Sequence, residues 1–218
     1  MTDITPALLL KAYACGIFPM AKTRVDKDVF WVQPKLRGII PLNDFHVSRS
    51  LRKRLRQNKY TVKVDTAFPE VLAGCAEQTS LRSDTWINSQ IKEIFSSLFD
   101  AGVTHSVEAW KEGQLVGGLY GLTIGAAFFG ESMFTRADDA SKVALCHLVG
   151  ILKRGNYVLL DTQFITDHLK QFGAIEISQK DYLTKLSAAL SRQGKFGEPL
   201  SQSDLERILS SQPSTQTS

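Results

Sequence analysis

Residues 104–129 read THSVEAWKEGQLVGGLYGLTIGAAFF, and this stretch decides the fold that the sequence predicts. Three strand-like runs follow one another at residues 104–110, 114–120 and 125–129. Lys111-Glu112-Gly113 supplies a turn between the first two runs. An antiparallel meander is therefore expected in the middle of the chain.

Segments with helical spacing flank this meander. Apolar side chains recur every three or four residues along residues 88–100 and again along residues 139–154, which Gly155 ends. Residues 157–160 form an apolar strand, and residues 175–177 suit an edge strand. This order of helices and strands predicts an α+β fold with a mixed sheet flanked by helices.

Pattern and composition divide the chain into three parts. Residues 1–36 contain a capped helix, an extended apolar step and a short strand, and are expected to form a small N-terminal unit. Residues 37–190 hold the meander and the main domain. Residues 191–218 are rich in Ser, Gln and Pro and are expected to form a loosely ordered tail, apart from a capping-box pattern at residues 203–206.

The composition narrows the class of protein. The 218 residues are 43% hydrophobic with a net charge of +4, so a sizeable core is expected. No apolar run is long enough to cross a bilayer, and no basic-then-apolar leader opens the sequence. The three cysteines and four histidines are scattered without metal-ligand spacing. We therefore expect a cytoplasmic monomer without membrane association, metal or cofactor.

One helix is expected to be strongly basic. Six Lys and Arg residues lie within residues 49–59, and no Asp or Glu occurs in residues 45–64. Arg49, Arg52, Lys53 and Arg56 recur at steps of three and four residues and so share one helix face. Such a face suits a phosphate backbone, although a merely solvated helix face is the alternative. The absence of interleaved acids favours contact with nucleic acid.

Three polar residues lie next to apolar stretches of the sequence and are candidates for a functional site. Glu131 follows two phenylalanines and either pairs with Arg136 or borders an apolar pocket that takes a cationic ligand. Asp161 and Gln163 follow the apolar strand at residues 157–160. They either face a ligand crevice at the end of that strand or cap the next helix.

Eight stretches carry a family resemblance. In order along residues 7–185 they are Ala12-Tyr13-x-x-Gly16-Ile17-Phe18-Pro19, His46-x-Ser48-Arg49-Ser50, Thr85-Trp86-Ile87, His105-Ser106-Val107-Glu108-x-Trp110, Leu115-Val116-Gly117-Gly118-Leu119-Tyr120-Gly121, Gly130-Glu131-Ser132-Met133-Phe134, Ala140-Ser141-Lys142 and Leu160-Asp161-x-Gln163-x-x-x-Asp167-His168. The ordered set resembles the leucyl/phenylalanyl-tRNA–protein transferase family.

This resemblance implies a GNAT-like acyltransferase domain and an aminoacyltransferase activity. Such an enzyme moves Leu, and also Phe and Met, from aminoacyl-tRNA to the N-terminal Arg or Lys of acceptor proteins. The acceptors are thereby marked for degradation by the N-end rule. An aminoacyl ester is already activated, so the reaction needs neither metal nor cofactor.

The resemblance also implies roles for individual residues. Asp161 and Gln163 would lie at the reaction centre, where the Gln163 oxygen accepts a hydrogen bond from the attacking amine. Asp161 would orient Gln163 and stabilise the developing ammonium. Glu131 would hold the basic N-terminal residue of the acceptor. Trp86, which otherwise either stacks on a base or covers the core, would lie against the terminal adenosine.

The remaining implied contacts are with the acyl side chain and with the body of the tRNA. The basic residues Arg49, Lys53 and Arg56 would contact the acceptor region of the tRNA. The apolar pocket for the transferred side chain would include Leu119, Phe128, Met133, Leu148 and Leu160.

One departure from the family pattern concerns the adenosine site. The family often has Trp after Gly-Ile-Phe-Pro, whereas this chain has Met20. One stacking wall on the adenosine is therefore expected to be built differently.

Two other functions fit parts of the sequence. An acyl-CoA N-acetyltransferase would share the fold, but residues 135–142 contain no glycine and two acids that would repel a pyrophosphate. A non-enzymatic RNA-binding module would explain the basic helix but not Glu131, Asp161 and Gln163.

Overall fold

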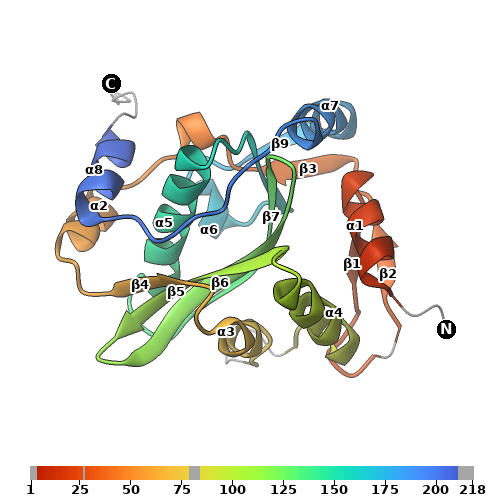
Figure 1. The fold of residues 1–218 in the computed structure, drawn as a ribbon, viewed down its shortest axis with the longest axis horizontal. Coiled ribbons are helices and arrows are strands. Elements are labelled where there is room, and N and C mark those ends of the chain that lie inside the picture. The colour runs from red at the N-terminus through yellow and green to blue at the C-terminus, as the bar shows by residue number, and fades with distance from the viewer. Residues whose placement is uncertain (1–3, 27, 79–83, 211–218) are drawn as a thin grey trace.

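A mixed β-sheet organises the computed structural model, which describes residues 4–26, 28–78 and 84–210 (Figure 1). Within these residues, seven strands pair in the order β4-β5-β6-β7-β8-β3-β9. Their bounds are β3 Leu36–Ile39, β4 Thr61–Val64, β5 Thr104–Lys111, β6 Gln114–Ile124, β7 Ala127–Thr135, β8 Leu159–Gln163 and β9 Ile175–Ser178. Only β7 and β8 pair in parallel among these neighbours, so the expected mixed sheet is confirmed.

The central meander forms as its sequence predicts. Glu112 and Gly113 both have positive φ, 51° and 78°, and close the two-residue turn between β5 and β6. Such a turn matches the twist of an antiparallel hairpin. The third strand, β7, extends six residues past the expected end at Phe129. It contains a bulge, since Tyr120 pairs with Ser132 and Gly121 with Gly130, which leaves Glu131 as the extra residue.

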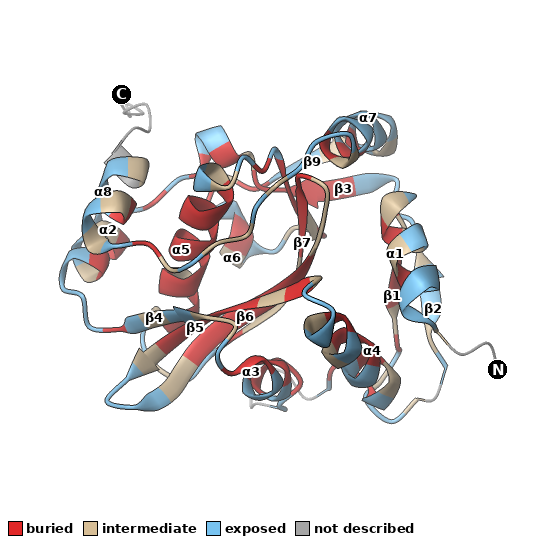
Figure 2. Cartoon of the chain, viewed as in Figure 1, coloured by how far each residue is buried: buried red, intermediate tan, exposed pale blue. Residues whose placement is uncertain are grey.

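Helices cover both faces of the sheet (Figure 1). On one face lies α5 (Ala140–Arg154), which is buried along most of its length (Figure 2). On the other face lie α3 (Phe68–Cys75) and α4 (Ser89–Asp100). Asn88 caps α4 by accepting a hydrogen bond from the Ile91 amide, as the sequence favours at a helix start. None of the helices in the described part of the chain is both long and apolar enough to span a bilayer.

The strand β3 was not expected from the sequence, and its pairing with β8 makes β8 longer than expected. It lies between β8 and β9, where Gly38 pairs with Gln163 and Ile39 with Asp161. These pairs extend β8 past Leu160, the expected end of that strand, as far as Gln163. Asp161 and Gln163 are therefore strand residues and do not cap a helix.

A small sheet lies beside the main one at the N-terminal end. It pairs β1 (Phe18–Met20) with β2 (Phe30–Val32) in antiparallel fashion. The helix α1 (Pro6–Ala14) precedes it and contacts α4 and α7 (Gln179–Leu190). Thr5 caps α1, with Pro6 in its first turn, as the sequence predicts.

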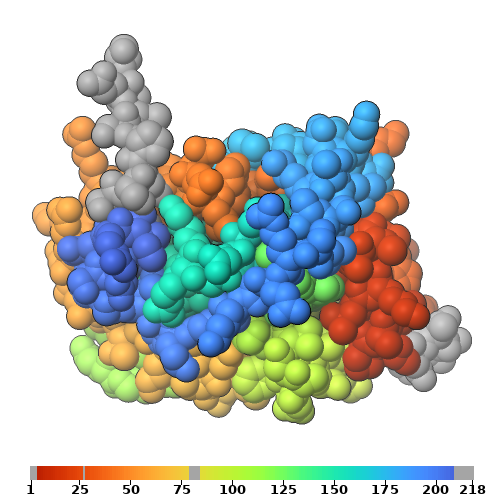
Figure 3. Space-filling model, turned by 45° about the horizontal axis from the view of Figure 1, so that its top comes forward, coloured from red at the N-terminus to blue at the C-terminus, as the bar shows by residue number. Residues whose placement is uncertain are grey.

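Residues 191–201 are packed and not loosely held as expected, whereas the helix indicated by the capping-box pattern at residues 203–206 does form. From α7 the chain crosses α5 to α8 (Gln202–Ser210), which packs against α5 (Figure 3). Phe196 stacks on His105 at 4.1 Å between ring centroids, and Leu200 and Leu205 are buried. Three widely spaced apolar side chains thus fix a polar segment, a pattern that composition does not reveal. Residues 211–218 lie outside the described residues.

The remaining elements are short. The 3₁₀ turn η1 (Leu42–Asp44) precedes the basic helix α2 (Arg49–Arg56), and α6 (Asp167–Lys170) follows β8. Figure 1 places α2 beside α8, at the end of the molecule opposite to the β1–β2 sheet.

Candidate active site

A cavity of about 310 Å³ opens where β7 and β8 separate. The two strands pair in parallel up to Phe129 and Asp161. Two residues beyond that last pair, Glu131 of β7 and Gln163 of β8 both line the cavity. Apolar residues from both faces of the sheet complete its walls. The separation of two central strands therefore creates a pocket that reaches through the sheet.

One wall of the cavity is apolar and belongs to the face that α5 covers. Four of the residues expected in an acyl pocket lie on it, namely Leu119, Met133, Leu148 and Leu160, and Leu145 of α5 joins them. None of these five side chains carries a charge. This wall therefore suits an apolar group.

Phe128, the fifth residue expected in that pocket, does not line the cavity. It lies in the paired part of β7, opposite Leu160 of β8. Its ring is fully buried and stacks on Phe196 at 5.6 Å between centroids. The expectation for Phe128 is wrong because a core contact with the C-terminal segment occupies its ring.

The opposite wall comes from segments far apart in the chain. Trp86, in the turn before α4, lines the cavity together with Phe18, Pro19 and Met20 of β1. Met20 stands where the family pattern often has Trp. An aromatic indole and a flexible thioether therefore border this side of the cavity.

Glu131 forms the polar corner of the cavity. The Tyr13 hydroxyl donates to its Oε1 atom at 2.8 Å, and Gln163 Nε2 donates to the same oxygen at 3.4 Å. Burial raises the pKa of Glu131 to about 8; the charge of Asp161 also raises it, whereas the Tyr13 hydrogen bond and the charge of Arg37 oppose the rise. The alternative in which Glu131 pairs with Arg136 does not form, because Arg136 binds Glu77 at 2.8 Å.

The raised pKa of Glu131 predicts how the free energy of unfolding depends on pH. In the folded chain Glu131 holds its proton up to about pH 8, whereas its usual pKa is 4.5. The folded state then binds more protons than the unfolded state between these values, so the free energy of unfolding falls as pH rises. Glu131→Gln should reduce this fall by at most about 1.4 kcal/mol per pH unit.

Denaturant unfolding at several pH values checks this prediction. Glu93→Gln, on the exposed face of α4, is the matched control and should leave the pH dependence unchanged. An identical pH dependence in the Glu131→Gln variant and the unmodified chain would show that Glu131 ionises normally.

Behind the cavity lies a buried ion pair between Arg37 of β3 and Asp161 of β8. Arg37 is 1% exposed and Asp161 0%. Arg37 Nε donates to Asp161 Oδ1 at 2.9 Å and Nη2 to Oδ2 at 2.6 Å, and Nη1 donates to the Gly16 carbonyl at 2.9 Å. The guanidinium lies over the rings of Phe18 and Tyr182, at 4.6 and 4.5 Å. The pair thus ties the N-terminal unit to the main sheet.

Asp161 does not line the cavity, which corrects part of its expected role. Its oxygens accept hydrogen bonds from Arg37, from the Tyr182 hydroxyl at 2.7 Å and from the Gln163 amide at 2.8 Å. A carboxylate enclosed in this way cannot contact an ammonium in the cavity. It can position Gln163, whose φ of 57° is unusual for a residue other than Gly.

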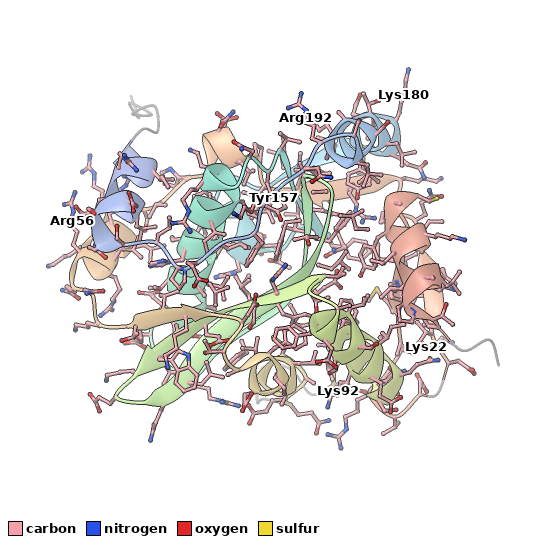
Figure 4. The ribbon with its side chains drawn as sticks, in the orientation of Figure 1. Lys22, Arg56, Lys92, Tyr157, Lys180 and Arg192 are labelled. Carbon is pink, nitrogen blue, oxygen red and sulfur yellow. The ribbon has the colours of Figure 1, made fainter. Side chains whose placement is uncertain are left out.

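The basic helix α2 forms as expected but lies apart from the cavity. Arg49, Lys53 and Arg56 are exposed, and none of them lines the cavity. Arg52 is half-buried and donates to the Val47 carbonyl at 3.1 Å. Figure 4 shows Arg56 projecting from the end of the molecule that carries α2 and α8. The structure therefore separates a basic surface from the polar corner of the cavity.

Comparisons with known proteins agree on one family. A family model described as leucyl/phenylalanyl-tRNA protein transferase matches residues 39–187, and the model of its N-terminal domain matches residues 2–35. A leucyl/phenylalanyl-tRNA–protein transferase from Paramagnetospirillum magneticum is 55% identical over 196 residues, which cover 90% of this chain and 94% of the relative. This chain belongs to the leucyl/phenylalanyl-tRNA–protein transferase family.

A second relative supports the same placement, and one solved structure bears on the fold. The leucyl/phenylalanyl-tRNA–protein transferase of Rhodospirillum rubrum is also 55% identical, over 90% of this chain and 92% of its own length. The crystal structure of FemX matches with a TM-score of 0.50 and 12% identity, over 95% of this chain and 72% of FemX. At that identity the likeness shows the fold alone. The expected GNAT-like α+β class is confirmed.

In this member of the transferase family, sequence reasoning missed three residues of the site. Tyr13, Arg37 and Tyr182 come from α1, β3 and α7 and meet Glu131 or Asp161 only in the folded chain. Arg37 did leave a signal, because it precedes the apolar residues Gly38-Ile39-Ile40. A cation inside an apolar strand requires a buried acid as partner. The sequence offered no comparable signal for the two tyrosines.

Proposed function

We propose that this chain transfers an aminoacyl group from aminoacyl-tRNA to the N-terminal amine of an acceptor protein. The observation that carries the proposal is one cavity in which an apolar wall, an aromatic wall and the polar pair Glu131 and Gln163 meet. These features suit the side chain, the terminal adenosine and the attacking amine. Both substrates of a condensation could then occupy adjacent parts of one site.

The donor fits the two walls. The uncharged wall around Leu119 and Leu148 would take the side chain of Leu, and also of Phe or Met, because size discrimination in an apolar pocket is worth only about 1–3 kcal/mol. The terminal adenosine would lie between Trp86 and Met20. This arrangement leaves the ester carbonyl near Gln163.

The acceptor fits the polar corner. An N-terminal Arg or Lys brings two positive charges, on its α-amine and on its side chain. The Glu131 carboxylate can pair with such a cation, which would favour the ionised form that burial alone disfavours. We propose that proteins with N-terminal Arg or Lys are the acceptors, that the reaction takes place in the cytoplasm, and that it marks these proteins for N-end rule degradation.

The reaction conserves atoms without an added cofactor. The deprotonated α-amine attacks the ester carbonyl, a C–N bond forms and the C–O bond to the 3′-oxygen of the tRNA breaks. The proton that the amine loses passes to that oxygen and leaves it as a hydroxyl. The α-amine has an ordinary pKa near 7.7–8.0, so part of it is already deprotonated near neutral pH and only slight help is needed to expose its lone pair.

Gln163 would orient the amine, and Asp161 would orient Gln163. Holding the amine and the ester as near-attack partners can supply on the order of 7–11 kcal/mol. We propose that the Gln163 carbonyl oxygen accepts a hydrogen bond from the amine. Asp161 then acts as a positioning residue through the Gln163 amide and not as a contact of the ammonium.

Two acids at the start of α5 argue against acyl-CoA as donor. Asp138 and Asp139 precede the helix where such enzymes bind a pyrophosphate, and Asp139 pairs with Lys142 at 2.8 Å and with Arg54 at 3.4 Å. Negative charge at a helix N-terminus opposes anion binding. The N-terminus of α5 is therefore unsuited to coenzyme A.

One assay tests the proposal against its alternatives. The chain is incubated with leucyl-tRNA and a peptide that begins with Arg, and the peptide is weighed by mass spectrometry. The expected result is a mass increase of one leucyl residue. Acetylation of the peptide from acetyl-CoA, or tRNA binding without transfer, would replace the proposal by an acetyltransferase or an RNA-binding module.

A second prediction concerns the tRNA surface. Arg49→Ala, Lys53→Ala or Arg56→Ala should each reduce the salt slope of tRNA binding by about one, because one phosphate contact is lost. Binding is measured over a series of salt concentrations. Lys180→Ala, on α7, is the control and should leave the slope unchanged (Figure 4). Unchanged slopes in all three α2 variants would remove that helix from the interface.

A further inference from the structure

The exposed aromatic ring of Phe30 lies beside the cavity wall that Met20 and Trp86 form, and it is not part of the hydrophobic core. Phe30 of β2 is 43% exposed. Of the described residues near it, Met20, Val29 and Val32 pack against the hydrophobic cluster that α3 and α4 cover, whereas Phe30 does not belong to that set. The ring of this phenylalanine is therefore open to contact with a ligand.

The strand register places Phe30 next to the cavity. Met20 lines the cavity and pairs directly with Phe30 across the antiparallel β1–β2 sheet. Directly opposed residues point to the same face, with Cβ atoms about 4.5–5.5 Å apart. Trp31 points to the other face of this small sheet and pairs with Pro19, which also lines the cavity. The Phe30 ring therefore extends the wall that begins at Met20.

Hydrogen bonds fasten this hairpin to the segment that carries Trp86. The Arg24 amide donates to Asp84 Oδ1 at 3.2 Å, and Asn88 Nδ2 donates to the Asp26 carbonyl at 2.9 Å. Asp84 and Asn88 each lie two residues from Trp86 in the chain. The positions of Phe30 and Trp86 are thus fixed relative to each other, so both can contact one strand of nucleic acid.

We propose that Phe30 stacks on the base of the nucleotide that precedes the terminal adenosine of the tRNA. This inference rests on the proposed function, in which the adenosine lies between Trp86 and Met20. Successive bases lie about 3.4 Å apart when they stack, and farther apart when they are splayed. The side chains of Met20 and its cross-strand partner Phe30 are separated by a similar distance, so the base that precedes the adenosine can reach the Phe30 ring. Exposed aromatic rings bind bases by stacking, whatever their sequence.

An exposed cation belongs to the same hairpin. Lys22, two residues after Met20, is exposed on the loop that joins β1 to β2. Figure 4 shows its side chain at the end of the molecule that carries this hairpin. A phosphate between the two nucleosides would meet this ammonium as it leaves the cavity.

Donors of different length test the proposal. Leucine is esterified to adenosine or to the dinucleotide CpA, which is the shared 3′ end of tRNAs, and KM is measured for each with an Arg-peptide acceptor. The unmodified chain should have a lower KM for leucyl-CpA. Phe30→Ala should raise the KM for leucyl-CpA by roughly 5- to 150-fold and leave that for leucyl-adenosine unchanged.

Three comparisons separate this result from a structural effect. Phe30→Leu keeps an apolar side chain without a flat ring and should lose the same preference, whereas Phe30→Trp should keep it. Ile175→Ala removes an apolar side chain of similar exposure, 46%, from β9, which does not border the cavity, and should change neither KM.

The outcomes also distinguish this inference from the proposed function. Transfer from both donors with a KM ratio that does not depend on Phe30, or that depends equally on Ile175, would overturn the inference and leave the proposed function intact. Transfer from neither donor, and none from leucyl-tRNA, would overturn both.

Discussion

Gln163→Ala is expected to lower kcat about 100-fold, while the affinity for tRNA changes little. Gln163 borders the cavity beside Glu131, 3.4 Å from its Oε1 atom, and in the proposed mechanism it holds the attacking amine. The same proposal places the main tRNA contacts elsewhere, on the α2 surface and on the wall that includes Trp86. Single-turnover transfer from leucyl-tRNA, together with a filter-binding measurement, separates the two quantities.

The backbone of Gln163 calls for a second variant. Its φ of 57° is left-handed, and alanine is strained in that region whereas asparagine tolerates it well. Gln163→Asn keeps the amide but shortens its reach, so it should also lose turnover without a loss of stability. Equal losses of kcat and tRNA affinity in both variants would contradict a role in the chemical step.

Arg37→Met is expected to destabilise the folded chain by about 3–5 kcal/mol, because it leaves the Asp161 carboxylate buried without its cation. Such a loss is a large fraction of the stability of an ordinary domain. The pair also joins β3 to β8 and, through the Gly16 carbonyl, to the N-terminal unit. Denaturant unfolding measures the loss, with Lys35→Met as a control on the loop before β3.

A double variant distinguishes the contribution of the Arg37–Asp161 pair to stability from its contribution to the position of Gln163. Arg37→Met with Asp161→Asn removes both charges and should regain part of the lost stability. Its kcat should stay low if the ion pair orients Gln163 through the amide hydrogen bond of 2.8 Å. Recovery of stability and turnover together would show that the pair only holds the fold.

Local sequence signals were sufficient for most of the fold. The turn at Glu112-Gly113, the capped start of α1, the helices α2 and α4, and the helical spacing of α5 all lie where the sequence places them. Each depends on residues within a few positions of one another. The strand β3, the helix α7 and the packed segment after it were missed, because long-range contacts stabilise them.

The candidate site was predicted unevenly for the same reason. Resemblance pointed to Glu131, Gln163 and Trp86, and all three line one cavity. It also pointed to Phe128, which a distant ring covers, and to Asp161, which a distant arginine encloses. A side chain on the face of a strand that borders the cavity can therefore still be covered by a residue from a distant part of the chain. The local sequence does not show which residue that is.

The sequence by itself determined the family, the central meander and the basic helix, because periodicity, turn residues and ordered motifs are local properties of the chain. Only the tertiary structure decided which polar groups share a site. Tyr13 and Glu131 are 118 positions apart, and Arg37 and Asp161 are 124 apart. Such contacts form because polar groups that become buried when the elements pack need hydrogen-bond partners. The sequence shows that a partner is needed, but not which residue it is.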